Sequence, residues 1–65
     1  MKTYEVFWKN NSNEIVNFHK QIEHLINADV IKYDFDNNTY TIPIYFTYQF
    51  LAIAKENNCT AVELE

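Results

Sequence analysis

Hydrophobic and polar residues alternate over residues 3–9, so that Tyr4, Val6 and Trp8 fall on one side of an extended segment. Successive side chains of a strand point to opposite faces, and aromatic and β-branched residues favour strands. The pattern therefore predicts a strand whose Tyr4, Val6 and Trp8 side chains face the core. The polar stretch over residues 10–13 predicts the break that follows it.

A helical period marks residues 14–27, where hydrophobic residues recur at Ile15, Phe18, Ile22, Leu25 and Ile26. This spacing predicts an amphipathic helix with one apolar stripe. Asn11 and Ser12 are both candidate N-caps, and Asn11 with Glu14 has the spacing of a capping box. Because no glycine follows the helix, Asn27 is the candidate for a left-handed residue at its end.

Alternation returns on both sides of a polar segment at residues 36–39, which predicts a hairpin with a turn rich in asparagine. The side chains expected to face the core from this hairpin are Ile31, Tyr33, Phe35, Tyr40, Ile42 and Ile44. Pro43 cannot donate a hydrogen bond to a neighbouring strand, so we expect the second strand of the hairpin to end near residues 42–44.

A second helix is predicted from about Phe46 to Asn57, begun either by Thr47 as a cap or by Pro43 in its first turn. Its expected core stripe is Phe46, Phe50, Ile53 and Ala54. A last alternating segment follows at residues 60–64, with Thr60, Val62 and Leu64 on one side. Taking these as the inward side leaves Glu63 and Glu65 on the opposite, open face.

The predicted order of elements is β-α-β-β-α-β, which is the ferredoxin-like pattern of the α+β class. Right-handed crossovers place both helices on one face of a four-stranded antiparallel sheet with the expected order 4-1-3-2. The chain of 65 residues is short enough that we expect a single small domain. Many unrelated proteins share this fold, so the fold alone does not indicate a function.

The composition excludes several classes of function. With one cysteine, the chain has neither a disulfide framework nor a cysteine-based metal cluster. With no glycine, it cannot form a glycine-rich phosphate loop. No apolar run is long enough to cross a membrane, and Glu5 stands where the apolar run of a signal peptide would begin, so we expect a cytoplasmic protein that does not bind membranes.

The residues that carry chemistry do not form a recognisable catalytic or metal-binding pattern. His19 and His24 are five positions apart, whereas a metal-binding pair on a helix needs a spacing of three or four. Cys59 has no neighbouring base or cation in the sequence to lower its pKa, so an enzyme would need His19 within hydrogen-bond reach of it. We therefore predict no enzymatic activity, no metal and no cofactor.

The formal charge of −4 argues against direct binding to nucleic acid, which requires an excess of Lys and Arg. The expected open face of the sheet bears Thr3, Glu5, Phe7, Lys9, Thr39, Thr41, Glu63 and Glu65, with a single aromatic ring for stacking on bases. An acidic patch is expected at Glu5, Asp34, Asp36, Glu63 and Glu65. It allows an alternative function, in which the protein mimics nucleic acid and inhibits a DNA- or RNA-binding protein. The simpler interpretation is that the charge keeps the domain soluble.

The second predicted helix carries hydrophobic residues outside its core stripe, which favours a surface for protein contact. These candidate interface residues are Tyr45, Tyr48, Leu51, Ala52 and Lys55. We therefore expect a non-enzymatic protein-interaction module that acts as an inhibitor or adaptor, with a protein partner or a second copy bound there. Abundant residues with AT-rich codons suggest an AT-rich genome, such as that of a phage, a mobile element or a low-GC bacterium, and we expect a phage or mobile-element inhibitor among these. The alternative is a small-ligand regulatory domain with a polar pocket near Asn10, Asn11 and Asn58.

Overall fold

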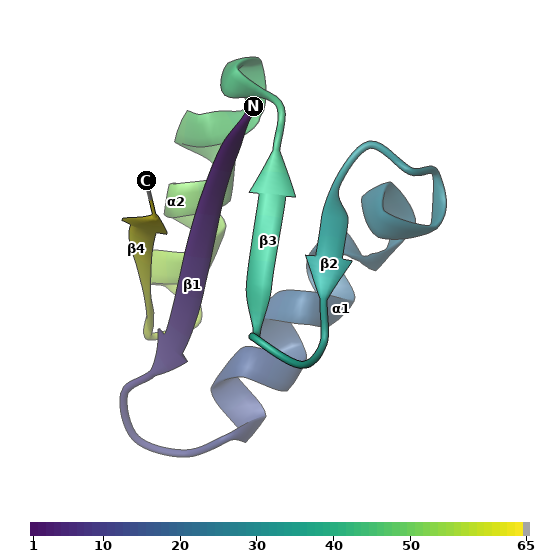
Figure 1. Ribbon diagram of the computed structural model, residues 1–65. Coiled ribbons are helices and arrows are strands. Elements are labelled where there is room, and N and C mark those ends of the chain that lie inside the picture. Colours follow the sequence, from purple (N-terminus) through teal and green to yellow (C-terminus); the bar gives the residue numbers. More distant parts are fainter. Residues whose placement is uncertain (65) are drawn as a thin grey trace.

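The computed structural model describes residues 1–64 and has the predicted element order. The elements are β1 (Lys2–Trp8), α1 (Asn13–Asn27), β2 (Lys32–Asp34), β3 (Thr39–Ile42), the 3-10 turn η1 (Ile44–Phe46), α2 (Thr47–Glu56) and β4 (Cys59–Leu64). The strands form one antiparallel sheet with the order β2-β3-β1-β4. Both helices lie on one face of this sheet, and its other face is open (Figure 1). The predicted ferredoxin-like fold and strand order are therefore confirmed.

The core lies between the sheet and the two helices, and aromatic rings form its centre. Phe50 of α2 packs against three of them, with ring centroids 5.4 Å from Tyr4, 5.3 Å from Phe18 and 5.7 Å from Tyr40. The buried residues around these rings are aliphatic or small: Val6, Ile22, Ile31, Ile42, Ala54 and Cys59. The predicted helix stripes and most of the predicted inward strand positions thus meet in one core.

Three residues expected in the core are instead exposed: Trp8 at 50%, Phe35 at 81% and Ile44 at 64%. Trp8 lies on the helix side, opposite the buried Cys59, but it is the last residue of β1, where the core ends. Phe35 follows the last residue of the short strand β2 and lies in the turn. Ile44 follows Pro43, where the strand has ended, and is the first residue of η1.

The prediction of which β4 side chains face the core was wrong by one position along the strand. Leu64, Val62 and Thr60 pair with Thr3, Glu5 and Phe7 of β1, and directly paired residues share a face of the sheet. Thr60, Val62 and Leu64 are therefore on the open face, and the small residues Cys59 and Ala61 face the core. Glu63 pairs with Tyr4 and lies on the helix side, not on the open face. Glu65 lies outside the described residues, and Lys9 lies beyond the end of β1.

Small side chains explain this register, because α2 packs close to β4. Cys59 is buried in the core with Ala54 of α2, and Ala61 packs against it, so the side of β4 that α2 covers bears small residues. Hydrophobicity alone favoured the opposite face, since Val62 and Leu64 are the larger apolar residues. Close packing of the helix on the strand therefore decides the register of β4 against the apparent hydrophobic pattern.

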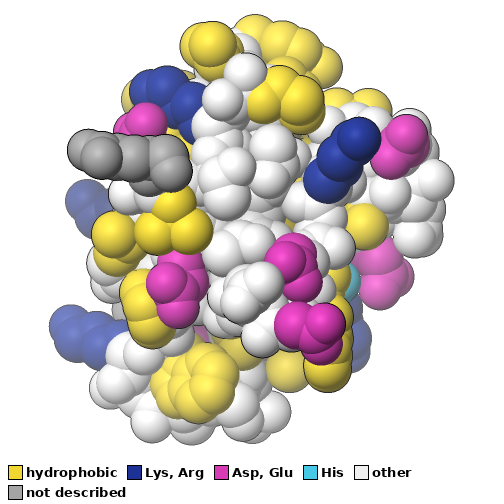
Figure 2. Space-filling model, in the orientation of Figure 1, with side chains coloured by type: hydrophobic (Ala, Val, Ile, Leu, Met, Phe, Trp, Pro, Cys, Tyr) yellow, Lys and Arg dark blue, Asp and Glu magenta, His cyan; other side chains and the backbone are white. Residues whose placement is uncertain are grey.

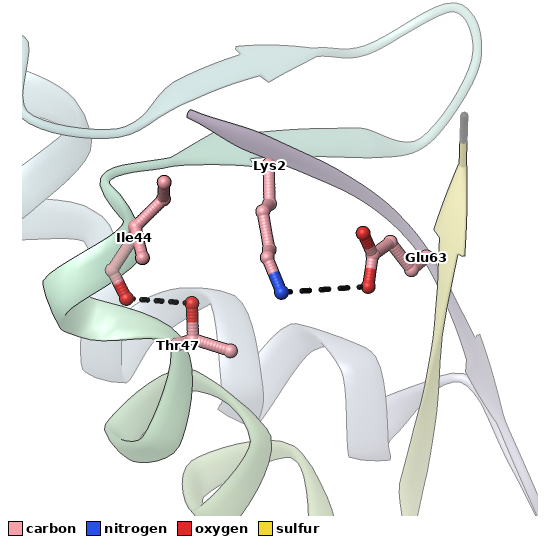
Figure 3. Close-up of polar contacts among 4 residues, drawn as sticks. All are labelled: Lys2, Ile44, Thr47 and Glu63. Carbon is pink, nitrogen blue, oxygen red and sulfur yellow. Dashed lines mark hydrogen bonds and ion pairs between the residues drawn. The ribbon is translucent and has the colours of Figure 1, made fainter.

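Polar residues replace glycine where the chain turns. Asn38 and Asn58 have positive φ angles of 53° and 58°, as the asparagine-rich turns predicted. After α1, however, Asp29 and not Asn27 takes the left-handed conformation, with φ 62°. Thr47 is not an accepting cap of α2, because its Oγ1 donates a hydrogen bond of 2.7 Å to the Ile44 carbonyl (Figure 3).

The start of α1 depends on Glu14, and one half of the predicted capping box is present, because the Asn11 amide donates to the Glu14 carboxylate while the Asn11 side chain bonds to Asn13 and not to the Glu14 amide. Glu14 Oε1 accepts backbone hydrogen bonds from Lys9 at 3.0 Å, Asn10 at 2.7 Å and Asn11 at 3.2 Å. In return, Asn11 Oδ1 accepts a hydrogen bond from the Asn13 amide. The Ser12 side chain makes no capping hydrogen bond. One carboxylate thus satisfies several amides in the loop that joins β1 to α1.

These hydrogen bonds predict an acid-sensitive contribution of Glu14 to stability. The Asn10 amide and the neighbouring donors lower the pKa of Glu14 from 4.5 to about 2. Because the folded pKa is the lower one, the stabilisation is present above about pH 4.5 and is lost as the pH falls toward 2. In thermal melts followed by circular dichroism, we expect Glu14→Gln to lose less stability than the wild type over this interval. Glu23→Gln, at an exposed position of the same helix, is the control and should retain the wild-type pH dependence.

Candidate functional site

Large hydrophobic side chains are exposed in three groups on the described residues. The exposed set is Met1, Phe7, Trp8, Val16, Phe35, Ile44, Tyr45, Tyr48, Leu51, Val62 and Leu64. Isolated exposed apolar residues are normal, but contiguous ones mark contact surfaces or ligand sites. One group lies on η1 and α2, one surrounds a groove beside α1, and one lies on the open face of the sheet.

The first group contains the predicted interface residues, and we call these the α2 surface: Tyr45, Tyr48, Leu51, Ala52 and Lys55. The last four line one shallow depression of about 340 Å³ along α2. Tyr45 precedes them in η1, and Tyr45 and Tyr48 are 76% and 82% exposed. The structure therefore brings four of the five predicted residues together on one side of α2, and places Tyr45 in the turn just before the helix. Whether a partner binds there stays a prediction.

Pro43 explains why the α2 surface begins with exposed side chains. With φ −64° and ψ 146°, Pro43 ends the strand, and the Phe46 amide donates to its carbonyl at 3.0 Å to close η1. This turn leaves Ile44 outside the core beside Tyr45, where it adds to the exposed apolar side chains of η1. Pro43 was the available signal. Figure 2 shows hydrophobic side chains gathered at the end of the molecule where η1 lies in Figure 1.

An ion pair joins the two strands beside the beginning of α2. Lys2 Nζ of β1 lies 3.7 Å from Glu63 Oε1 of β4, with side chains 37% and 53% exposed (Figure 3). Solvent screens such a pair, so it contributes little to stability. The pair lies on the helix side of the sheet, away from the acidic residues of the open face.

The second group surrounds a groove between α1 and the β2–β3 hairpin, which we call the aromatic groove. It encloses about 670 Å³ and is lined by Trp8, Ile15, Val16, His19, Lys20, Glu23, Tyr33, Phe35, Asn38 and Tyr40. The sequence prediction missed this site because it assigned Trp8 and Phe35 to the core. The available signal was that both rings directly precede polar segments, where strands end.

Ring contacts hold the groove together. His19 Nδ1 is 2.9 Å from the Tyr40 hydroxyl, and the His19 ring lies edge-on to Tyr33 with centroids 4.7 Å apart. Tyr33 in turn packs 4.7 Å from Tyr40 and 6.4 Å from Phe35. Burial raises the pKa of the Tyr40 hydroxyl well above its usual range, so it stays protonated. His19 and Tyr40 thus form a hydrogen-bonded pair of rings in the lining of the groove.

The third group, on the open face, mixes apolar and hydroxyl side chains with acidic ones. Thr3 and Thr41 are hydrogen-bonded across β1 and β3 at 2.9 Å. Figure 2 shows a pale centre of backbone and other polar atoms, with acidic and hydrophobic side chains around it. The predicted acidic patch is divided, because Glu5 and Asp34 share this face through Thr39 whereas Glu63 does not. This division weakens the nucleic-acid-mimic alternative.

The two residues that an enzyme hypothesis requires bond to different partners. Cys59 is buried, its thiol donates to the Asn57 carbonyl at 3.6 Å, and burial raises its pKa. Among residues 1–64, no hydrogen bond joins this thiol to His19, whose Nδ1 contacts Tyr40. A raised pKa also disfavours the reactive thiolate.

Other predicted sites can be placed in the same way. Within residues 1–64, no cluster of three or more His, Cys, Asp and Glu side chains is arranged to hold a metal ion. No described helix has the length and apolar character needed to cross a membrane. Neither the α2 depression nor the aromatic groove is lined by Asn10, Asn11 or Asn58, where a polar ligand pocket was expected.

Comparison with known proteins adds no functional information. No protein-family model, no curated protein and no solved structure matches the chain.

Proposed function

We propose that the protein is a non-enzymatic interaction module that binds a larger protein, or a second copy of itself, through the α2 surface. The observation that carries this proposal is a pair of largely exposed tyrosines: Tyr48, which lines one depression of α2 with Leu51, and Tyr45, in the turn η1 that leads into the helix. Tyrosine is enriched at the energetic centres of protein interfaces, because it combines a large apolar ring with a polar end.

The opposite side of α2 supports the proposal, because it holds the tyrosines in place before any partner binds. Phe50 and Ala54 are buried in the core, and Phe46 packs against it at the start of the helix. The backbone under Tyr48 is therefore anchored, and binding needs to order only its side chain. Lys55 completes the surface as a charged rim residue.

Such a small, anchored surface suits an inhibitor or an adaptor that acts by contact alone. The residue composition, rich in amino acids with AT-rich codons, supports a phage or mobile-element origin for an inhibitor of this kind. Self-association is the second possible use of the same surface, because burying it would add apolar contact to a core that is small.

Replacing Tyr48 by glutamate is expected to weaken association by at least about 10-fold, because a charge replaces an interface ring. We would measure self-association by sedimentation velocity and capture of partners from native cells with wild-type and Tyr48→Glu baits in parallel. Phe35→Glu is the matched control, since it makes the same change at an equally exposed ring outside the α2 surface. Both variants should keep the wild-type melting temperature within a few degrees.

The proposal is contradicted if Tyr48→Glu binds and self-associates as the wild type does. It is equally contradicted if Phe35→Glu causes the loss and Tyr48→Glu does not, because contact would then be made at the aromatic groove.

A further inference from the structure

The aromatic groove has the dimensions and lining of a small-molecule site. Its volume of about 670 Å³ lies within the range of roughly 300–1,000 Å³ that ligand pockets occupy. Rings reach it from separate parts of the chain: Trp8 from the end of β1, His19 from α1, Tyr33 and Tyr40 from the hairpin strands and Phe35 from the turn. The fold therefore gathers aromatic surface that no local sequence motif contains.

Two of these rings are left incompletely packed at the opening. Trp8 is half exposed and Phe35 is largely exposed, whereas Tyr40 in the lining of the same groove is buried. A flat ring bound in the groove would have exposed aromatic surface to cover. An aromatic ring in offset or edge-to-face contact with another ring gains stabilisation beyond that of the area it buries. The lining thus selects an aromatic occupant.

Polar groups in the groove can orient an uncharged aromatic molecule through hydrogen bonds. Among the described residues, His19 is hydrogen-bonded only by Tyr40 through Nδ1, so its Nε2 remains for an occupant. Asn38 donates through Nδ2 to the Val6 carbonyl at 2.6 Å, which leaves its Oδ1 as an acceptor. Lys20 and Glu23 line the groove with opposite charges. The site therefore favours a neutral molecule with a hydroxyl or N–H group.

We infer that the aromatic groove binds a neutral small molecule with one or two fused aromatic rings and a polar hydrogen. This site is separate from the α2 surface and does not rest on the proposed function. It also differs from the polar loop pocket near Asn10, Asn11 and Asn58 that the sequence suggested for a ligand, because its contacts are mainly with rings.

The test uses 2-naphthol as the probe and follows the chemical shifts of the backbone amides and of the Trp8 indole N–H. Trp8 is the only tryptophan in the chain, so its indole signal reports on the groove alone. We expect saturable binding with shifts at Trp8, His19 and Phe35. Phe35→Ala should weaken binding at least about fivefold through loss of a ring contact. Tyr48→Ala, which removes an equally exposed ring elsewhere, should leave it unchanged.

Three matched probes test the chemical class. 2-Naphthoate adds a negative charge, 2-(aminomethyl)naphthalene adds a positive charge, and decahydro-2-naphthol removes the aromaticity. Each should bind at least about fivefold more weakly than 2-naphthol. Equal binding of the saturated probe, equal binding by Phe35→Ala, or shifts centred outside the groove would each overturn the inference. A charged probe that binds more tightly than 2-naphthol would overturn the assignment of a neutral ligand.

Discussion

Phe50→Ala is expected to leave the protein largely unfolded at room temperature. Phe50 is fully buried at the centre of the core, within 6 Å of the ring centroids of Tyr4, Phe18 and Tyr40. Truncating such a ring to alanine costs about 3–5 kcal/mol, because contacts are lost and a cavity remains. A core in a chain of this size rarely supplies more than about 3–5 kcal/mol in total. One substitution therefore removes most of the free energy of unfolding.

Circular dichroism and urea titration of the variant measure this loss directly. Tyr48→Ala is the matched control, since it removes an aromatic ring from the same helix at a largely exposed position. It should change the free energy of unfolding by less than about 0.5 kcal/mol. A cooperative transition of Phe50→Ala at nearly the wild-type urea concentration would show that the aromatic core is not the main source of stability.

The second large effect is expected at Asn38, which has two separate roles in the hairpin turn. Its backbone has φ 53°, a conformation that asparagine tolerates better than alanine. Its side chain donates a hydrogen bond of 2.6 Å to the carbonyl of the buried Val6. Asn38→Ala should therefore lower the free energy of unfolding by about 2 kcal/mol, roughly half from the backbone and half from the hydrogen bond.

Asn38→Gly separates these roles, because glycine accepts the positive φ but cannot donate to Val6. We expect it to cost about 1 kcal/mol in urea titrations, less than Asn38→Ala. Asn58 is the comparison position, with φ 58° and no side-chain hydrogen bond among the described residues. Asn58→Gly should be neutral or slightly stabilising. Equal costs for glycine at both positions would show that the bond to Val6 contributes nothing.

The local sequence pattern was sufficient to predict the helices and strands of this protein, because hydrophobic periodicity and turn residues act over a few positions. The apolar stripe from Ile15 to Ile26 and the polar stretch before it predict α1, and the alternation around residues 36–39 predicts the hairpin. The strand order could also be predicted, because short loops and right-handed crossovers allow few arrangements of four strands and two helices. The position of the candidate residues Tyr48, Leu51, Ala52 and Lys55 on one side of α2 also follows from helical spacing alone.

The sequence by itself therefore determined the element order, the sheet topology, most of the core and the composition of the α2 surface. Only the tertiary structure decided which face of β4 is buried, because that depends on the close approach of α2 to Cys59 and Ala61. It also decided that Trp8 and Phe35 lie at the limits of the core and line a groove with His19. Whether a residue near the end of a strand is buried depends on the side chains that pack against it, and these come from parts of the chain distant in sequence.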